Sequence, residues 1–257
     1  MFSPINEAHS TVTLDEFLNQ CLATSGRQFV FRGQADATWP LVPSGFRAAD
    51  GSLCPTAERN RRIREFQGEP FQEAVKGLRE LLKQREDIAE LDGAEFSRLQ
   101  LMVIAQHFGV PTPLLDWTLS PLIAAYMAYK FKRGPGEIAI FRMDQSTRSD
   151  DLIWAKYSQV SFKRISSQLG GITCFGQLSA GNIQITPETF DEYFAENSAE
   201  ISAGRLDCFI SKVAVRITAV DIERLTEVLE CNGIKTENLF PDSGYWRAQS
   251  IRETLKF

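Results

Sequence analysis

Apolar residues recur at two different spacings along this chain of 257 residues, and the spacing predicts the type of each element. Where they recur every three or four positions, the sequence predicts helices at residues 13–23, 56–91, 94–108, 122–131, 186–196, 219–232 and 243–255. Where bulky apolar residues alternate or form short runs, it predicts strands at residues 28–33, 114–118, 137–143, 172–179 and 208–217. The two kinds of element mix without regular strand–helix–strand spacing, which favours an α+β fold with a mixed or antiparallel sheet surrounded by several helices.

Local signals mark several of the element boundaries. Thr11 or Thr13 is a candidate cap for the first helix, and Gly233 follows the helix at 219–232 as a stop signal. Pro121 stands at the first turn of its helix, where proline is tolerated. We expect a single domain over residues 1–257 with a helical insertion at about 56–92, interrupted near 68–70 because proline cannot continue a helix. The basic residues of that insertion are expected on a solvated helix face: Arg59, Arg61, Arg62 and Arg64.

The segment Leu114-Leu115-Asp116-Trp117-Thr118 is the first candidate for chemistry. A carboxylate directly after an apolar pair needs partners, or its pKa rises. Polar groups at the end of a strand, just before a helix, are a common way to present a site. The alternative is structural: Asp116 caps the next helix or holds the turn.

A second candidate lies in Phe29-Val30-Phe31-Arg32-Gly33-Gln34, an apolar strand that ends in an arginine and a glycine. Arginine is always charged and presents a forked donor that matches phosphate or carboxylate. Gly33 permits close approach of backbone or ligand. Arg32 is therefore either an anion ligand or half of a buried ion pair.

Bulk composition excludes some classes of protein. The formal net charge is −5, from 28 basic and 33 acidic residues, which argues against a strongly basic nucleic-acid-binding surface. Five scattered cysteines without a CxxC pair fit reduced thiols of a cytoplasmic protein. Because the chain has only two histidines, far apart in the sequence, we do not expect a metal site. Neither a membrane-spanning run nor a secretory signal is expected, and the sequence lacks the glycine fingerprint of a Rossmann fold.

Five strings, in this order, resemble the FRG domain family, which takes its name from the tripeptide at Phe31-Arg32-Gly33. In that family an arginine usually follows the Pro-Thr pair, whereas this chain has Pro113 there, so any anion support from that arginine is missing. The residues that carry the resemblance are Phe31 to Gln34 with Trp39, Pro43-Ser44 with Arg47, Gln106 to Thr112 with Leu114 to Thr118, Pro121 and Ala125, Arg164-Ile165 with Gln168 and Gly170, and Gly233-Ile234 with Leu239 to Asp242.

The order of these elements is also similar to an ADP-ribosyltransferase fold. Such enzymes place an arginine on a first core strand, as Arg32 would be, and a hydroxyl-bearing strand before an alanine-rich helix, as Thr118 would be. A late glutamate or glutamine completes their triad, and Gln168 is the candidate here. The resemblance implies NAD+ as substrate, with no metal. It implies Arg32 and Gln168 as catalytic groups. Asp116, as an anion near the ribose cation, and His107, as a base, are further catalytic candidates because of their own chemistry. Arg32, Gly33, Gln34, Trp117 and Thr118 are the expected binding set.

Several alternatives stay open within this hypothesis. Trp117 either stacks on nicotinamide or packs under its strand, and His107 is either a general base or a helix-terminal histidine bonded to a carbonyl. The resemblance implies a bacterial toxin or antiphage effector in the cytoplasm, with a protein or RNA acceptor and an inhibitory antitoxin as partner. Gln168 in place of a glutamate, together with Pro113, favours instead a noncatalytic nucleotide- or ligand-sensing module, and NAD+ hydrolysis without transfer is a third hypothesis.

Overall fold

The strands predicted from short apolar runs form the centre of the molecule. The computed structural model describes residues 2–5, 7, 10–23, 29–69, 71, 73, 98–107, 109–132, 134, 136–146, 149–156, 169–179, 182–204, 209–235 and 239. The five predicted strands are confirmed as β3 (Phe29–Gln34), β4 (Leu115–Thr118), β5 (Gly136–Asp144), β7 (Gly170–Ser179) and β9 (Ile210–Ile217). The pattern did not predict four short strands, β1 (Ser3–Pro4), β2 (Thr11–Thr13), β6 (Leu152–Lys156) and β8 (Asn182–Ile185).

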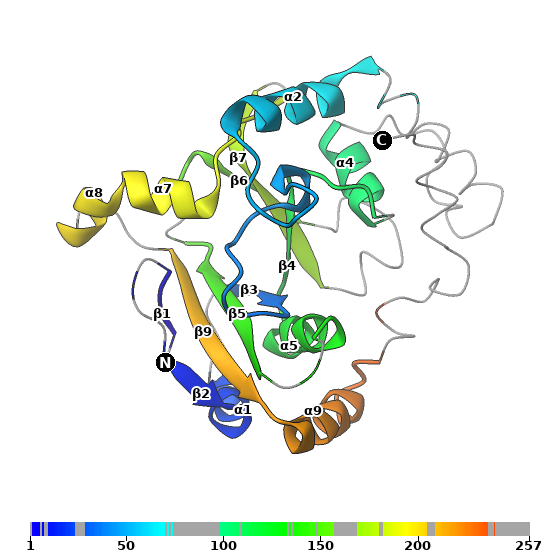
Figure 1. Cartoon of the computed structure of the whole chain (residues 1–257), viewed down its shortest axis with the longest axis vertical. Coiled ribbons are helices and arrows are strands. Elements are labelled where there is room, and N and C mark those ends of the chain that lie inside the picture. Colours follow the sequence, from blue (N-terminus) through cyan, green and yellow to red (C-terminus); the bar gives the residue numbers. More distant parts are fainter. Residues whose placement is uncertain are drawn as a thin grey trace.

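Within the described residues these strands form one open sheet in the order β1-β9-β5-β3-β4-β7-β6, with β2 on β9 and β8 on β7 (Figure 1). Every pair is antiparallel except that of β2 with β9. The fold class is therefore α+β, as predicted. The central strand β3 lies between β5 and β4, so that Arg32 stands opposite Phe141 and Phe31 opposite Thr118.

Helices cover both faces of this sheet. Six predicted helices are present, five of them with ends shifted by at most a few residues, whereas the helix predicted at 56–91 is described only over 56–67. The short α8 was not predicted. The helices are α1 (Leu14–Ala23), α2 (Thr56–Gln67), α4 (Arg98–His107), α5 (Pro121–Lys130), α7 (Phe190–Glu196), α8 (Ser198–Ser202) and α9 (Ala219–Cys231). The predicted helix at 243–255 and most of the segment 68–97 lie outside the described residues, so the insertion is described mainly by α2.

Capping fixes several of these helix ends. The Thr13 hydroxyl accepts a bond from the Glu16 N–H, and the Glu16 carboxylate accepts one from the Thr13 N–H, so Thr13 rather than Thr11 is the cap of α1. The helix predicted from residue 186 begins only at Phe190, because Thr189 caps it in the same way. Gly233 follows α9 with φ of +72°, as the stop signal requires.

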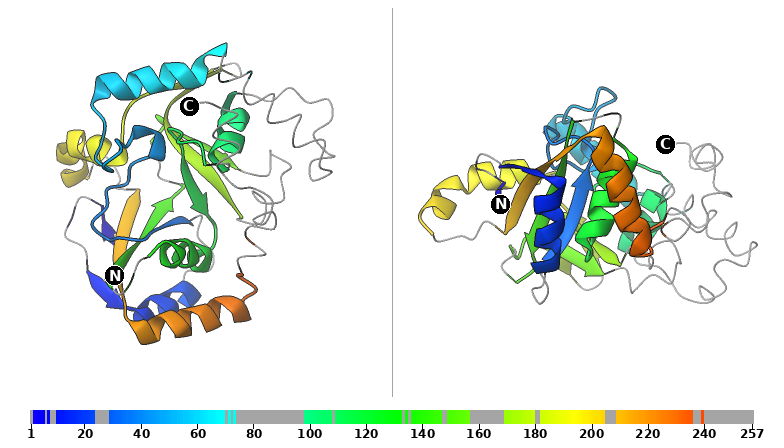
Figure 2. Two further views of the ribbon diagram at one scale, coloured as in Figure 1. Left: turned by 45° about the vertical axis from the view of Figure 1, so that its right-hand side comes forward. Right: turned by 90° about the horizontal axis from the view of Figure 1, so that it is seen from below.

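One face of the sheet carries α1, α5 and α9, which lie side by side (Figure 2), and also α2 and α4. Ile63 and Phe66 of α2 pack with Met102 of α4 and Ile172 of β7, so α2 belongs to the core. The opposite face carries α7, whose Phe190 packs with Phe141. The sheet thus separates two apolar layers, and its strand alternation decides the layer to which each side chain contributes.

Arg59 of α2 joins these two layers. Its side chain is only 4 % exposed, so the prediction of a solvated face is wrong at this position. Its guanidinium donates to both carboxylate oxygens of Glu192 on α7 at 2.6 Å, and to the hydroxyl of Thr56 at 3.0 Å. The expectation holds better for Arg61, whose side chain is 53 % exposed and bonds neighbours on its own helix.

The contact between β3 and α5 depends on Gly33. A Cβ added at Gly33 would lie 1.8 Å from the carbonyl oxygen of Ala124 and 2.8 Å from its carbonyl carbon. Both atoms are backbone, so neither can move without shifting the helix. Gly33→Ala is expected to destabilise the fold by at least about 2 kcal/mol, measured by denaturant unfolding.

Gly51→Ala is the matched control, because Gly51 has φ of +85° but no atom within 4 Å of an added Cβ. This variant should lose only about 1 kcal/mol, from backbone strain alone. Equal losses at both positions would contradict a close packing of α5 on β3.

Removing the Glu192 charge tests the link between the layers. Glu192→Gln leaves the buried Arg59 guanidinium without its counter-ion, at an expected cost of about 2–4 kcal/mol near pH 7. Glu65→Gln, which disrupts an exposed pair with Arg61, should cost less than about 1 kcal/mol.

The Glu192 contribution should also depend on pH. The hydrogen bond from Arg59 lowers the pKa of Glu192 below its usual 4.5, so the folded state binds the proton less readily than the unfolded state. The stability difference between wild type and Glu192→Gln should be full above about pH 4.5 and shrink as the pH falls towards the lowered pKa. A difference that is constant between pH 7 and pH 3 in thermal melts would exclude this ion pair.

Candidate functional site

Arg32 lies near the end of the central strand β3, where its side chain is partly buried. Its Nη1 donates to the backbone carbonyl oxygen of Asp116 on the neighbouring strand β4, at 2.9 Å. The carbonyl orients one edge of the guanidinium. A planar, forked donor of this kind matches the geometry of phosphate and carboxylate.

The register of the sheet places Arg32 on the face of α7. Arg32 stands opposite Phe141, and cross-strand partners share a face. Phe141 packs in the apolar layer of Phe190 and Phe194 from α7. The next residue, Gly33, faces the other way and contacts α5.

Asp116 and Thr118 lie on the face opposite to that of Arg32. Asp116 stands opposite Ile172, which packs with α4, and Thr118 stands opposite Phe31, which packs with α5. The side chains of Arg32, Asp116 and Thr118 therefore do not meet in one cleft, although the resemblance implied that they belong to one site. What Asp116 offers to Arg32 is its backbone carbonyl. Gln168, another of the predicted catalytic residues, lies outside the described residues.

Thr118 is a buried part of the turn that begins α5. Its hydroxyl accepts a bond from the N–H of Ser120 at 3.1 Å, and the Ser120 hydroxyl accepts one from the N–H of Ile123 at 3.3 Å. These bonds satisfy donors at the start of α5 that the helix itself leaves unpaired. The position of Thr118 before an alanine-rich helix thus has a structural explanation.

Trp117 is 2 % exposed and packs under its strand, which is one of the two alternatives given by the sequence. Its indole N–H donates to the hydroxyl of Thr173 at 2.8 Å, and its ring lies edge-on to Phe190 with centroids 6.2 Å apart. A ring enclosed in this way presents no free face to nicotinamide.

Gln34 is buried on the same face as Arg32, at the end of β3. Its Nε2 donates to the carbonyl oxygen of Pro40 at 3.4 Å. Its Oε1 is buried and has no hydrogen-bond partner among the described residues. Buried acceptors of this kind are normally satisfied by water or a ligand.

The predicted base His107 is buried at the end of α4. It belongs to the segment Gln106 to Thr112, which is part of the family resemblance. The neighbouring Gln106 side chain accepts a bond from the hydroxyl of Thr112. Thr112 in turn bonds the loop after β3, through its N–H to the Ser44 hydroxyl at 3.3 Å and its carbonyl to the Gly45 N–H at 2.8 Å. Gln106 and Thr112 thus connect the end of α4 to the loop after β3. This part of the family resemblance therefore has a structural role.

Lys212 of β9 is a functional candidate that the sequence analysis missed. It stands opposite Phe141, is 7 % exposed, and donates through Nζ to the carbonyl oxygen of Ala37 at 2.5 Å. Burial lowers its pKa, while the negative charges of Asp191 and Asp36 act in the opposite direction. The strand also contains Ser211 and Arg216, so the sequence alone did not distinguish the buried Lys212 from a solvent-facing residue.

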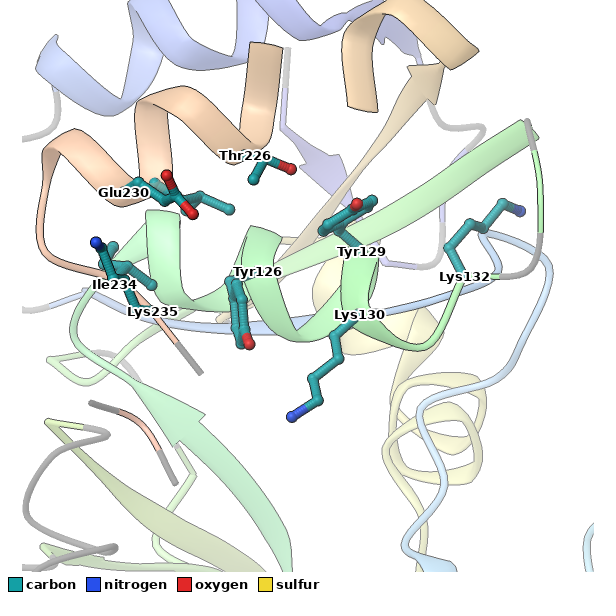
Figure 3. Close-up of a pocket in the computed structure, with 9 residues that line it drawn as sticks. Tyr126, Tyr129, Lys130, Lys132, Thr226, Glu230, Ile234 and Lys235 are labelled. Carbon is teal, nitrogen blue, oxygen red and sulfur yellow. The ribbon is translucent and has the colours of Figure 1, made fainter. Parts of the chain in front are cut away.

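A cavity of about 390 Å³ lies between α5 and α9, and none of the predicted site residues lines it (Figure 3). The two helices run antiparallel there, with Lys235 beyond the end of α9 and Lys132 beyond the end of α5. Its wall is formed by Tyr126, Tyr129, Lys130, Lys132, Thr226, Leu229, Glu230, Ile234 and Lys235. The cavity and Arg32 are separate features of the molecule.

The described residues contain neither a clustered set of metal ligands nor a membrane-spanning helix. No cluster of three or more histidine, cysteine, aspartate or glutamate side chains there has the arrangement of a metal site. No helix in the same residues has the length and apolar character needed to cross a membrane.

Comparison with known proteins gives a family match for part of the chain. No curated protein and no solved structure matches the chain. Residues 27–135 match the FRG domain family, a range that contains β3, α2, α4, β4 and α5. This match supports the FRG family for the part of the chain that carries Arg32 and its contact with β4.

Proposed function

We propose that the chain is an NAD+-dependent ADP-ribosyltransferase with Arg32 as its anion-binding residue. The observation that carries the proposal is the position of Arg32 on a central strand, with its guanidinium oriented by the backbone of the neighbouring strand β4. The strand after it in the sheet leads directly into the alanine-rich helix α5, which packs back on β3. The arginine strand, the hydroxyl-bearing strand and the alanine-rich helix are thus neighbours in space.

The proposed reaction breaks the bond between the ribose C1′ and the nicotinamide nitrogen, and the electron pair leaves with nicotinamide. An acceptor nucleophile then bonds to C1′ and loses its proton. The cationic, oxocarbenium-like ribose needs a firmly held dinucleotide more than covalent help from the protein. Arg32 would bind the pyrophosphate, and Gly33 and Gln34 would shape the end of the strand beside it.

Gln168 would bind the ribose. His107 lies at the end of α4, which packs on the face of the sheet opposite to Arg32, so we do not propose it as the proton acceptor. Asp116 would act through its carbonyl, which orients Arg32. The proposed setting is a bacterial cytoplasm, where the enzyme acts on protein or RNA as a toxin or antiphage effector under the control of an inhibitory partner.

A noncatalytic nucleotide-binding module is the second candidate. The specific observation in its favour is the separation of Arg32 from the side chains of Asp116 and Thr118 by the sheet. With the Asp116 carboxylate on the opposite face, Arg32 would bind an anion without that group taking part in its cleavage. NAD+ hydrolysis, with water as the acceptor, differs from the first candidate only in the final step.

Radiolabelled NAD+ incubated with the protein and a bacterial cell extract tests the enzyme. Label should transfer to the protein or the RNA fraction with wild type, and the initial rate should fall by at least about 100-fold with Arg32→Ala, because loss of one charge-assisted contact costs about 3 kcal/mol. Arg216→Ala, which removes an arginine with a 65 % exposed side chain, is the matched control and should retain the wild-type rate.

Each other result has a defined meaning for a protein that melts cooperatively. Release of free nicotinamide without labelled product would replace transfer by hydrolysis. Binding of NAD+ without consumption would support the sensing module. Transfer at the wild-type rate by Arg32→Ala would contradict the role of Arg32.

A further inference from the structure

The four tryptophans of the chain differ in their surroundings. Trp117 is enclosed in the core, and Trp154 is partly buried against the backbone of Gly171. Trp246 lies outside the described residues. Trp39, in contrast, is 45 % exposed. Tryptophan is usually well buried, and an exposed indole is typical of binding surfaces.

The loop that carries Trp39 is ordered by its own hydrogen bonds. The Asp36 carboxylate accepts bonds from the N–H of Thr38 at 2.8 Å and from its hydroxyl at 2.7 Å. The carbonyl oxygen of Asp36 accepts a bond from the N–H of Trp39 at 3.3 Å. These are the bonds of a compact turn, so the backbone of Trp39 is set before any ligand arrives.

The same loop is fastened to the sheet on both sides of Trp39. Before it, Ala37 donates to the carbonyl of Glu137 at 3.2 Å and accepts from the ammonium of Lys212. After it, Pro40 accepts from the amide of Gln34. Gln34 and Lys212 both project from the face of the sheet that carries Arg32. The loop therefore holds an exposed indole beside that face.

We propose that Trp39 is the ring-binding residue of the Arg32 site. Its indole stacks on the planar base of a nucleotide whose phosphate is bound by Arg32. Stacking of a base on an aromatic side chain contributes about 1–3 kcal/mol, and a fixed loop keeps the entropic cost low. The inference rests on the proposed function for the class of ligand, and it assigns to Trp39 the stacking role that the buried Trp117 does not fill.

Equilibrium binding of two small ligands distinguishes the contribution of the base to the affinity from that of the phosphate. Adenosine monophosphate carries both, whereas ribose 5-phosphate lacks the base. Trp39→Leu should weaken binding of adenosine monophosphate by about 5- to 150-fold, the range that corresponds to one stacked base, and leave ribose 5-phosphate unchanged. Trp39→Phe should recover part of the loss, because it keeps a ring. Arg32→Ala should weaken both ligands.

Isothermal titration calorimetry measures the affinity of each protein for both ligands, and thermal melting checks that each variant is folded. Trp39→Leu is expected to melt like wild type, since the indole is exposed. Trp154→Phe serves as a second tryptophan control and should bind both ligands normally.

The inference and the proposed function can fail separately. Ring-dependent binding that needs Trp39, in a protein that never consumes NAD+, supports the inference and removes the enzyme. NAD+ consumption with an unchanged KM in Trp39→Leu overturns the inference and leaves the enzyme. Equal loss of both ligands in Trp39→Leu, or no nucleotide binding by the folded wild type, also overturns the inference.

Discussion

The contact between Gly33 and α5 is the constraint on which the arrangement of this molecule depends. The helix backbone lies so close to β3 that an added Cβ at Gly33 would overlap the Ala124 carbonyl. Strand alternation then directs the flanking residues Arg32 and Gln34 away from α5. One glycine thus determines which face of the sheet carries the charge of Arg32.

The remainder of the fold supports this separation. One apolar layer contains α1, α2, α4, α5 and α9, and the other contains α7, with the sheet between them. The pair of Arg59 and Glu192 connects the layers around the sheet, through helices that are distant in sequence. Because the buried guanidinium needs this counter-ion, the pair is more consequential for stability than the exposed arginines of the same helix.

The sequence could predict the elements with strong periodicity or clear end signals. The alternation in β3 and β5, the cap at Thr13 and the stop at Gly233 depend on neighbouring residues alone, and all are found as expected. The short strands β6 and β8 depend on pairing with β7, which local pattern does not encode. Arg59 was expected in solvent because its partner Glu192 is 133 positions away in the chain.

The site was predicted in part for the same reason. Residue types identified Arg32 and Gln34, which do share a face, but spacing alone did not reveal that Asp116 and Thr118 face α4 and α5. Trp117 was a binding candidate because it stands next to a hydroxyl-bearing residue in the sequence, but its burial shows that it belongs to the core. Side-chain direction depends on strand register, and register is a tertiary property.

Binding of ADP-ribose to wild type, Arg32→Ala and Asp116→Ala tests the central claim, that the ligand binds on the face of Arg32. The account predicts a loss of affinity of about 100-fold for Arg32→Ala, equivalent to about 3 kcal/mol, and near wild-type affinity for Asp116→Ala. The second variant keeps the backbone carbonyl that holds the guanidinium and removes only a side chain on the opposite face. Equal loss in two variants that both melt like wild type would place the ligand on the face of the sheet that carries α4 and α5 and contradict the account.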